Sequence, residues 1–372
     1  MKKEKRRGEP GAIGIFRRLC ALLGVLVGSV LVLGILILAV ARYCNAPPAW
    51  PPEDIPQNSM LRMEDDGTVY AEVEIRNGES AMSVGRRLEN AGLIKTRYFW
   101  NLLARLDDGR IKAGVYRFKK PVSQFQIRSI LVEGRQEPRR VTIPEGLTLS
   151  KTAALLEEGE ICDAKDFLAA VRDPDIIGKY PVSGPTMEGY LYPDTYFFPV
   201  PYPADKVIDT MANTFFERLK EIASESIGMD PRELNRKVIL ASIVEREYRV
   251  PEEAPLMAGV FYNRLEIGMK LQSCATVEYV ITEIQGRPHP TVLYDRDTEI
   301  QNPFNTYVMP GLPPGPIASP GAVALNAAFH PQASNYLYFR LADSALGKHY
   351  FSKTFDEHIR AASLYVKGSA VN

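Results

Sequence analysis

The stretch that decides the architecture of this 372-residue chain lies near its beginning, at residues 19–41, and reads LCALLGVLVGSVLVLGILILAVA. None of its 23 residues is charged. A helix of that length, at about 1.5 Å per residue, is long enough to cross a hydrocarbon core of roughly 30 Å. We therefore expect residues 19–41 to form a single transmembrane helix.

The charges on the two sides of this helix predict its orientation. Seven basic residues precede it against two acidic ones, and an excess of Lys and Arg marks the cytoplasmic side of a membrane segment. The tail at residues 1–18 is thus predicted to be cytoplasmic, and the chain after Arg42 to lie outside the cell membrane. A cleaved signal peptide is the alternative, but its apolar region is usually about 7–15 residues long and ends at a small-x-small site, which this sequence lacks.

The formal net charge of zero hides an asymmetry between the two ends of the chain. Beyond residue 42 the chain has 37 basic and 43 acidic residues, a net charge of −6, so it offers no basic footprint for nucleic acid. Its four histidines show no metal-ligand spacing, and nothing in the spacing of its four cysteines demands a disulfide. We therefore expect no metal, no cofactor and no nucleic-acid partner.

The external part is long enough for two domains. A proline-rich linker at residues 42–68, expected to be a stiff spacer, leads into a first module at residues 69–139. Val69–Ile75 alternates apolar and polar residues, as a half-buried strand does. Two capped helices and a return strand at Gly114–Phe118 follow, so the module is predicted to have the order strand, helix, helix, strand.

Residues 140–366 are predicted to form a second, larger domain, followed by a short tail at residues 367–372. Helical patterns cover residues 149–157, 164–171, 204–224, 235–248, 252–267 and 355–365. The aromatic and proline-rich segment 187–203 is expected to be irregular, and residues 271–355 to be rich in loops. Helices and strands mix without a regular βαβ rhythm, which indicates the α+β fold class.

A candidate for catalysis stands at the end of the predicted helix 235–248. Seven residues, apolar except for Ser242, run directly into Glu245. At about 100° per residue Glu245 shares a face with Ser242, whereas Glu247 points about 200° away, so the two glutamates are not expected to work as a pair. A partly desolvated carboxylate has a raised pKa and can donate a proton, as a general acid must. An ion pair from Glu245 to Arg249 on a solvated helix end is the alternative.

Polar and aromatic side chains that could contact a sugar gather in further clusters. Amides can orient hydroxyl and acetamido groups, and aromatic rings can stack on a sugar, in a carbohydrate groove. The candidate substrate-binding residues are Glu188, Tyr192, Ser242, Asn263, Arg264, Gln272, Asn305 and Tyr307. The alternative is that such residues cap helix ends or lie in surface loops.

Together these clusters resemble the endolytic murein transglycosylase family, the YceG-like proteins. The matching motifs follow one another in the family's order over nearly the whole external part. They are Asn77-Gly-Glu-Ser80, Leu93-Ile-Lys-Thr96, Ala113-Gly-Val-Tyr116, Val141-Thr-Ile-Pro-Glu-Gly-Leu-Thr148, Glu188-Gly-Tyr-Leu-Tyr-Pro-Asp-Thr-Tyr196, Leu240-Ala-Ser-Ile-Val-Glu-Arg-Glu247, Phe261-Tyr-Asn-Arg-Leu265, Leu271-Gln-Ser273, Asn305-Thr-Tyr307, Gly311-Leu-Pro-Pro-Gly-Pro-Ile317 and His349-Tyr-Phe351.

The resemblance implies a LysM-like first module and a catalytic second domain. It implies cleavage of the β-1,4 bond between N-acetylmuramic acid and N-acetylglucosamine in nascent peptidoglycan strands, leaving a 1,6-anhydro end, and a place beside the cell-wall synthesis machinery. Glu245 occupies the family's catalytic position, as general acid and then base. Glycosidases usually need two carboxylates, but here the muramyl C6 hydroxyl replaces water as the attacking group.

One departure from the family pattern stands out. After Leu271-Gln-Ser273 the family usually has Asp-Pro, whereas Cys274 and Ala275 stand here. An alternative function from another class is a non-catalytic, membrane-anchored scaffold that binds peptidoglycan. An intact Glu245 argues against that alternative.

Overall fold

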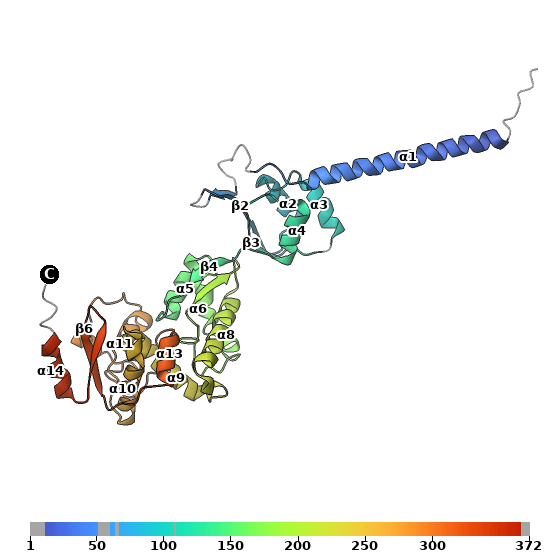
Figure 1. Cartoon of the computed structure of the whole chain (residues 1–372). Helices are drawn as coiled ribbons and strands as arrows, with labels where there is room; N and C mark the ends of the chain where they lie inside the picture. Colours follow the sequence, from blue (N-terminus) through green and yellow to red (C-terminus); the bar gives the residue numbers. More distant parts are fainter. Residues whose placement is uncertain (1–11, 51–59, 64–66, 108, 366–372) are drawn as a thin grey trace, which may run out of the picture. The chain divides into compact units, whose positions relative to one another are not determined.

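The computed structural model describes residues 12–50, 60–63, 67–107 and 109–365. The chain divides into two compact units, residues 1–137 and 138–372, and Figure 1 labels many of their elements. The predicted tail at residues 367–372, most of the tail at residues 1–18 and the middle of the predicted linker lie outside the described residues.

The first unit begins with the long helix α1, Ala12–Asn45. Its segment Leu19–Asn45, with a mean hydropathy of 2.9, is the only one in the described part of the chain that is long and apolar enough to cross a membrane. The large apolar side chains of this segment are exposed along its length. The helix also takes in Arg42–Asn45, which we had placed in the linker, because the first helix-breaking prolines come only at Pro47 and Pro48.

The last turn of α1 packs directly on the module that follows it. The Gln124 side-chain amide donates to the carbonyl of Cys44 at 3.0 Å, and the Asn45 side-chain oxygen accepts the backbone N–H of Phe125 at 3.1 Å. The module is therefore in contact with the end of the helix, and the predicted stiff spacer lies largely outside the described residues and stays a prediction.

The module packs a three-stranded antiparallel sheet, in the order β1-β2-β3, with three helices. Its elements are β1 (Leu61–Met63), β2 (Val69–Ile75), α2 (Ala81–Asn90), α3 (Arg97–Leu106), β3 (Gly114–Phe118) and α4 (Gln124–Glu133). The fully buried Trp100 fills the core, and its indole N–H donates to the carbonyl of Ala81 at 2.8 Å. Gly85 is required there, because a Cβ atom would lie 2.5 Å from the Trp100 ring.

The second unit mixes helices with two two-stranded antiparallel sheets, β4–β5 and β6–β7, so the α+β fold class is confirmed. Its elements are β4 (Arg139–Thr142), α5 (Leu149–Glu158), α6 (Ala164–Ala170), α7 (Pro174–Ile177), β5 (Thr195–Phe198), α8 (Ala204–Ile222), η1 (Ser224–Ser226), α9 (Pro231–Glu247), η2 (Pro251–Glu253), α10 (Ala254–Glu266), α11 (Cys274–Tyr279), the π-helix η3 (Val280–Ile284), α12 (Asp295–Thr298), α13 (Ala322–Phe329), β6 (Tyr338–Asp343), β7 (Lys348–Ser352) and α14 (Phe355–Tyr365).

Two segments are more regular than the sequence predicted. Residues 187–203 contain β5, whose buried Tyr196 and Phe198 alternate with the exposed Phe197 as a strand on β4 requires. Residues 271–355, expected to be rich in loops, contain the helices α11 and α13 and the strands β6 and β7. Helix α13 is apolar on nearly every side because it is buried, so it shows no amphipathic period.

The site region is built around α9, which packs against α10, α11 and α13. The hairpin β6–β7 packs on α14, and β6 also contacts α10 (Figure 1). The end of α9 is thereby surrounded by elements from the whole second half of the unit.

Candidate active site

Helix α9 ends in the two glutamates that the sequence singles out. Asp230 caps the helix, because its side chain accepts hydrogen bonds from two backbone N–H groups of the first turn. Pro231 follows at the first helical position, where an N–H group would have no partner within the helix, so proline costs no hydrogen bond there. Residues 238–244 are all buried. This rigid core fixes the last turn of the helix, where Glu245 and Glu247 lie.

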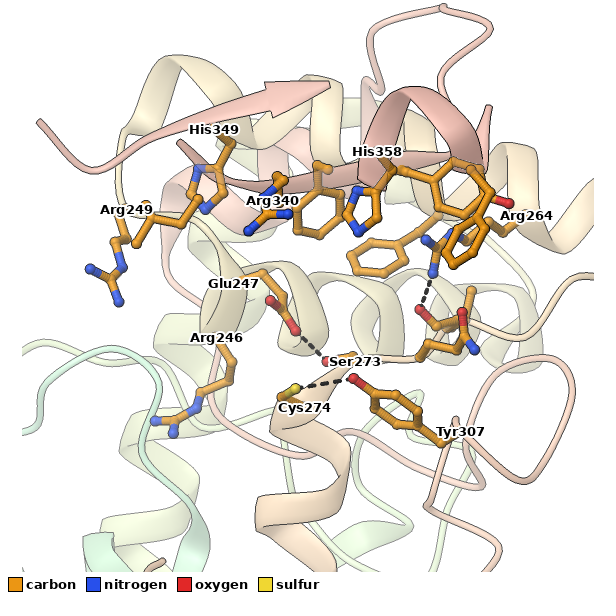
Figure 2. A pocket seen from close by; sticks show the side chains of 17 residues that line it. Arg246, Glu247, Arg249, Arg264, Ser273, Cys274, Tyr307, Arg340, His349 and His358 are labelled. Atoms are coloured by element: carbon orange, nitrogen blue, oxygen red, sulfur yellow. Dashed lines mark hydrogen bonds between the residues drawn. The ribbon is translucent and has the colours of Figure 1, made fainter. Parts of the chain in front are cut away.

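Glu247 lines a cavity of about 490 Å³, shown in Figure 2. Its carboxylate accepts a hydrogen bond from the Ser273 hydroxyl. Burial raises the pKa of the Glu247 carboxyl, the Ser273 hydroxyl lowers it, and the nearby Glu278 carboxylate raises it again, with a net upward shift. Glu247 therefore holds a proton to higher pH than an exposed glutamate does, at the wall of a cavity.

Glu245 lies in a different environment. Its carboxylate accepts the backbone N–H of Gly321 at 2.9 Å. Burial raises the pKa of Glu245 to about 7, the Gly321 N–H works against this shift, and the Glu145 carboxylate adds to it. A side chain at Gly321 would collide with Glu145. Glu145 had no role in the sequence analysis, where the only signal for it was the motif Val141–Thr148.

Three of the predicted binding residues lie in the same cavity as Glu247, namely Arg264, Gln272 and Tyr307. The Arg264 guanidinium donates to two backbone carbonyls at 2.6 and 2.5 Å. Gln272 has a left-handed backbone with a φ of 53° and an exposed side chain. The Tyr307 hydroxyl lies 3.1 Å from the sulfur of Cys274, also in the cavity wall (Figure 2).

The other five predicted binding residues do not line this cavity. Ser242 and Asn305 are fully buried and bond to backbone groups, and the Ser242 hydroxyl accepts the backbone N–H of Ile317 in the loop before α13. Asn263 donates to two backbone carbonyls before β6. Glu188 and Tyr192 are 4% and 8% exposed, and Glu188 borders a separate cavity of about 540 Å³.

The hairpin β6–β7 and α14 add side chains to which sequence reasoning gave no role. Arg340 on β6, His349 on β7 and His358 on α14 line the cavity. Figure 2 shows them along one side, with Glu247 and Ser273 on the other. The motif that begins at His349 was their only signal in the sequence.

The cavity is equipped for proton transfer. Among the residues that the structure describes, no group of three or more His, Cys, Asp or Glu side chains could hold a metal ion. The cavity offers a carboxylate with a raised pKa, the hydroxyls of Ser273 and Tyr307, and the amide of Gln272. Such a set can hold a polar ligand and donate a proton to it.

Known proteins with sequences or structures similar to this chain agree with this architecture. The YceG-like family profile matches residues 73–363. Proteins from Streptococcus pneumoniae and Bacillus subtilis, each named endolytic murein transglycosylase, are both 30% identical to this chain, over 340 and 325 residues, or 83% and 82% of it. The matched region spans 61% of the Streptococcus relative and 87% of the Bacillus relative.

A crystal structure of a YceG-like protein from Listeria monocytogenes has a TM-score of 0.52 and 31% identity, and covers 78% of this chain and 98% of its own. The profile match takes in both the module and the second unit with its cavity. From these sequence and structural matches over most of its length, the chain belongs to the YceG-like family.

Proposed function

We propose that this protein is a membrane-anchored lytic transglycosylase that cleaves peptidoglycan glycan strands internally. The names of its relatives support the activity, and it is a proposal because the chain spans only 61% of the Streptococcus relatives. The observation that carries it is the position of Glu247, a carboxylate with a raised pKa in the wall of a cavity of about 490 Å³. The cavity is lined by hydroxyl, amide and aromatic groups, as a sugar site requires.

The reaction needs one acid that turns into a base. The protonated carboxyl donates its proton to the glycosidic oxygen of the β-1,4 bond between N-acetylmuramic acid and N-acetylglucosamine. The resulting carboxylate then takes the proton of the muramyl C6 hydroxyl as that oxygen bonds to C1. The products are a 1,6-anhydro end and a free C4 hydroxyl, no water is consumed, and the carboxyl is protonated again.

Two carboxyls on α9 compete for this role. The cavity favours Glu247, which has the Ser273 hydroxyl, Gln272 and Tyr307 around it. The assignment of Glu245 from the family motif stays a prediction, and its pKa of about 7 also suits a general acid.

The test is digestion of polymeric peptidoglycan by the purified full chain in detergent micelles, with mass detection of the products. We expect muropeptides with anhydro ends, each lighter by one water than a hydrolysed end, released from the interior of strands. Hydrolysed ends would show a different reaction. Binding without cleavage would instead support the non-catalytic scaffold.

We also propose that α1 anchors the chain once in the cell membrane, with its beginning in the cytoplasm and the second unit outside. The basic residues before Leu19 and the hydropathy of Leu19–Asn45 support this orientation. A reporter fused after residue 372 should be active outside the cytoplasm, and activity inside would overturn the topology. Contact with the wall-synthesis machinery stays a prediction.

A further inference from the structure

The cavity around Glu247 is unusually rich in positive charge. Four arginines line it, Arg246, Arg249, Arg264 and Arg340, whereas Glu247 is the only acidic residue in its wall. Burial and the nearby Glu278 carboxylate raise the pKa of Glu247, whereas the Ser273 hydroxyl lowers it. A cleft with walls of one sign concentrates ligands of the opposite sign.

Two of these arginines are occupied by the protein itself. Arg246 forms an ion pair with Glu278 at 3.1 Å and also donates to a backbone carbonyl. Arg264 is held by the carbonyls of Leu337 and Leu271, and its guanidinium stacks on a tyrosine ring. Their guanidinium groups serve to hold the cavity wall in place.

Arg340 differs from both. No acidic side chain within the described residues pairs with it, and its buried Nε has no hydrogen-bond partner. A buried donor without a partner costs free energy in the empty protein. Its position on β6 places it in the cavity wall between His349 and His358 (Figure 2).

The surroundings of His358 are also rich in positive charge. Its Nδ1 is buried without a partner in the described part of the chain. Burial lowers the pKa of His358, and the charges of Arg340 and Arg264 lower it further. Two cations thus act on His358 on this side of the cavity, whereas the Glu253 carboxylate is bonded to His349.

We propose that Arg340 binds a carboxylate of the peptide stem carried by the glycan strand, so that the cavity selects strands with charged stems. This proposal rests on the proposed function, and it names the part of the substrate that the cavity recognises beyond the sugars. The sugar rings themselves are uncharged, whereas the stems bring carboxylates close to each muramyl residue. Arginine suits this task because its planar guanidinium can bond both oxygens of a carboxylate.

The test compares two substrates that differ only in charge. Glycan strands with native stems are digested beside strands whose stem carboxyls have been converted to primary amides, by the full chain in detergent micelles. We expect the parent protein to cleave native strands roughly tenfold to hundredfold faster in kcat/KM, the ratio expected for one hydrogen bond to a charged group. Equal rates on both substrates would overturn the proposal, whereas no cleavage of either would overturn the proposed function instead.

Two variants test whether Arg340 is the residue that causes the preference for native stems. Arg340→Gln should lose the preference and cleave both substrates at the slow rate of the amidated one. Arg232→Gln, an exposed arginine at the far end of α9 that does not line the cavity, should keep the preference of the parent. If Arg340→Gln keeps the preference too, another cation binds the stem carboxylate and the proposal is wrong. Melting temperatures of both variants confirm that they fold.

Discussion

Glu245 and Glu247 stand two residues apart on one helix, yet they lie in two different environments. Glu245 faces Gly321 and Glu145, and its partner is a backbone N–H. Glu247 faces the cavity, and its partner is the Ser273 hydroxyl. Both carboxyls have raised pKa values. The comparison shows that a raised pKa does not by itself select the acid, because the two residues share it and differ in their neighbours.

The largest effect is expected from Glu247→Gln. The amide keeps the size of the side chain but cannot give or regain a proton, so turnover should fall by about 10²–10⁴, the usual scale for a positioned general acid–base. Anhydro products are measured by mass, and binding of strands by co-sedimentation should be unchanged. Glu245→Gln on the same helix is the matched control. A loss in Glu245→Gln alone would reverse the assignment and restore the one predicted from the family motif.

A smaller effect is expected from Ser273→Ala. The Ser273 hydroxyl stabilises the charged form of Glu247, so its removal should raise the pKa of Glu247 further. The alkaline limb of the pH–rate profile should move to higher pH, and kcat should fall roughly tenfold through the lost orientation of the carboxyl. A profile with an unchanged alkaline limb would show that Glu247 does not titrate in the reaction.

Glu245→Gln should act mainly on stability. The pKa of Glu245 is about 7 in the folded chain against an ordinary value of 4.5, so its contribution to stability is complete below pH 4.5 and is lost as pH rises through 7. The glutamine variant avoids that loss. Its melting temperature should match the parent at pH 4 and exceed it at pH 8 by roughly 2–4 °C, with turnover within about threefold. A variant that melts lower than the parent at pH 8 would contradict the environment described for Glu245.

The smallest effect is expected from Cys274→Asp, which restores the residue usual in the family. Turnover at the optimum should change less than about threefold, because Gln272 and Tyr307 already provide polar contacts in the cavity. The new carboxylate near Glu247 should move the alkaline limb of the pH–rate profile upward. Cys274→Ala serves as the control for loss of the thiol. A tenfold gain in turnover would show that the missing aspartate takes part in the chemistry.

Local patterns predicted the elements that have one buried and one exposed face. Strands β2 and β3 begin and end where their alternation begins and ends. Helix α13 was missed because a helix buried on all sides has no period to detect, and β5 was missed because prolines surround it.

The cavity, like the fold, could be predicted only where a local pattern in the sequence marks it. Arg264, Gln272 and Tyr307 were named from the sequence because amides, cations and aromatics near a helix end are visible in it, and the structure places all three in the cavity wall; their role in binding stays a prediction. Periodicity also separated the faces of Glu245 and Glu247. Which face borders a cavity was invisible, because β6, β7 and α14 supply the opposite wall from far along the chain.

The direct contact between α1 and the module has a consequence for the anchor. At about 1.5 Å per residue, the 27 residues of Leu19–Asn45 span roughly 40 Å, against roughly 30 Å of hydrocarbon. In a bilayer such a surplus is absorbed by tilt or by lifting the helix end into the headgroups. Because Cys44 and Asn45 are bonded to the module, either response moves the module as well. In the membrane-anchored arrangement proposed above, lipid thickness would therefore change the height and the inclination of the module as well as those of the helix.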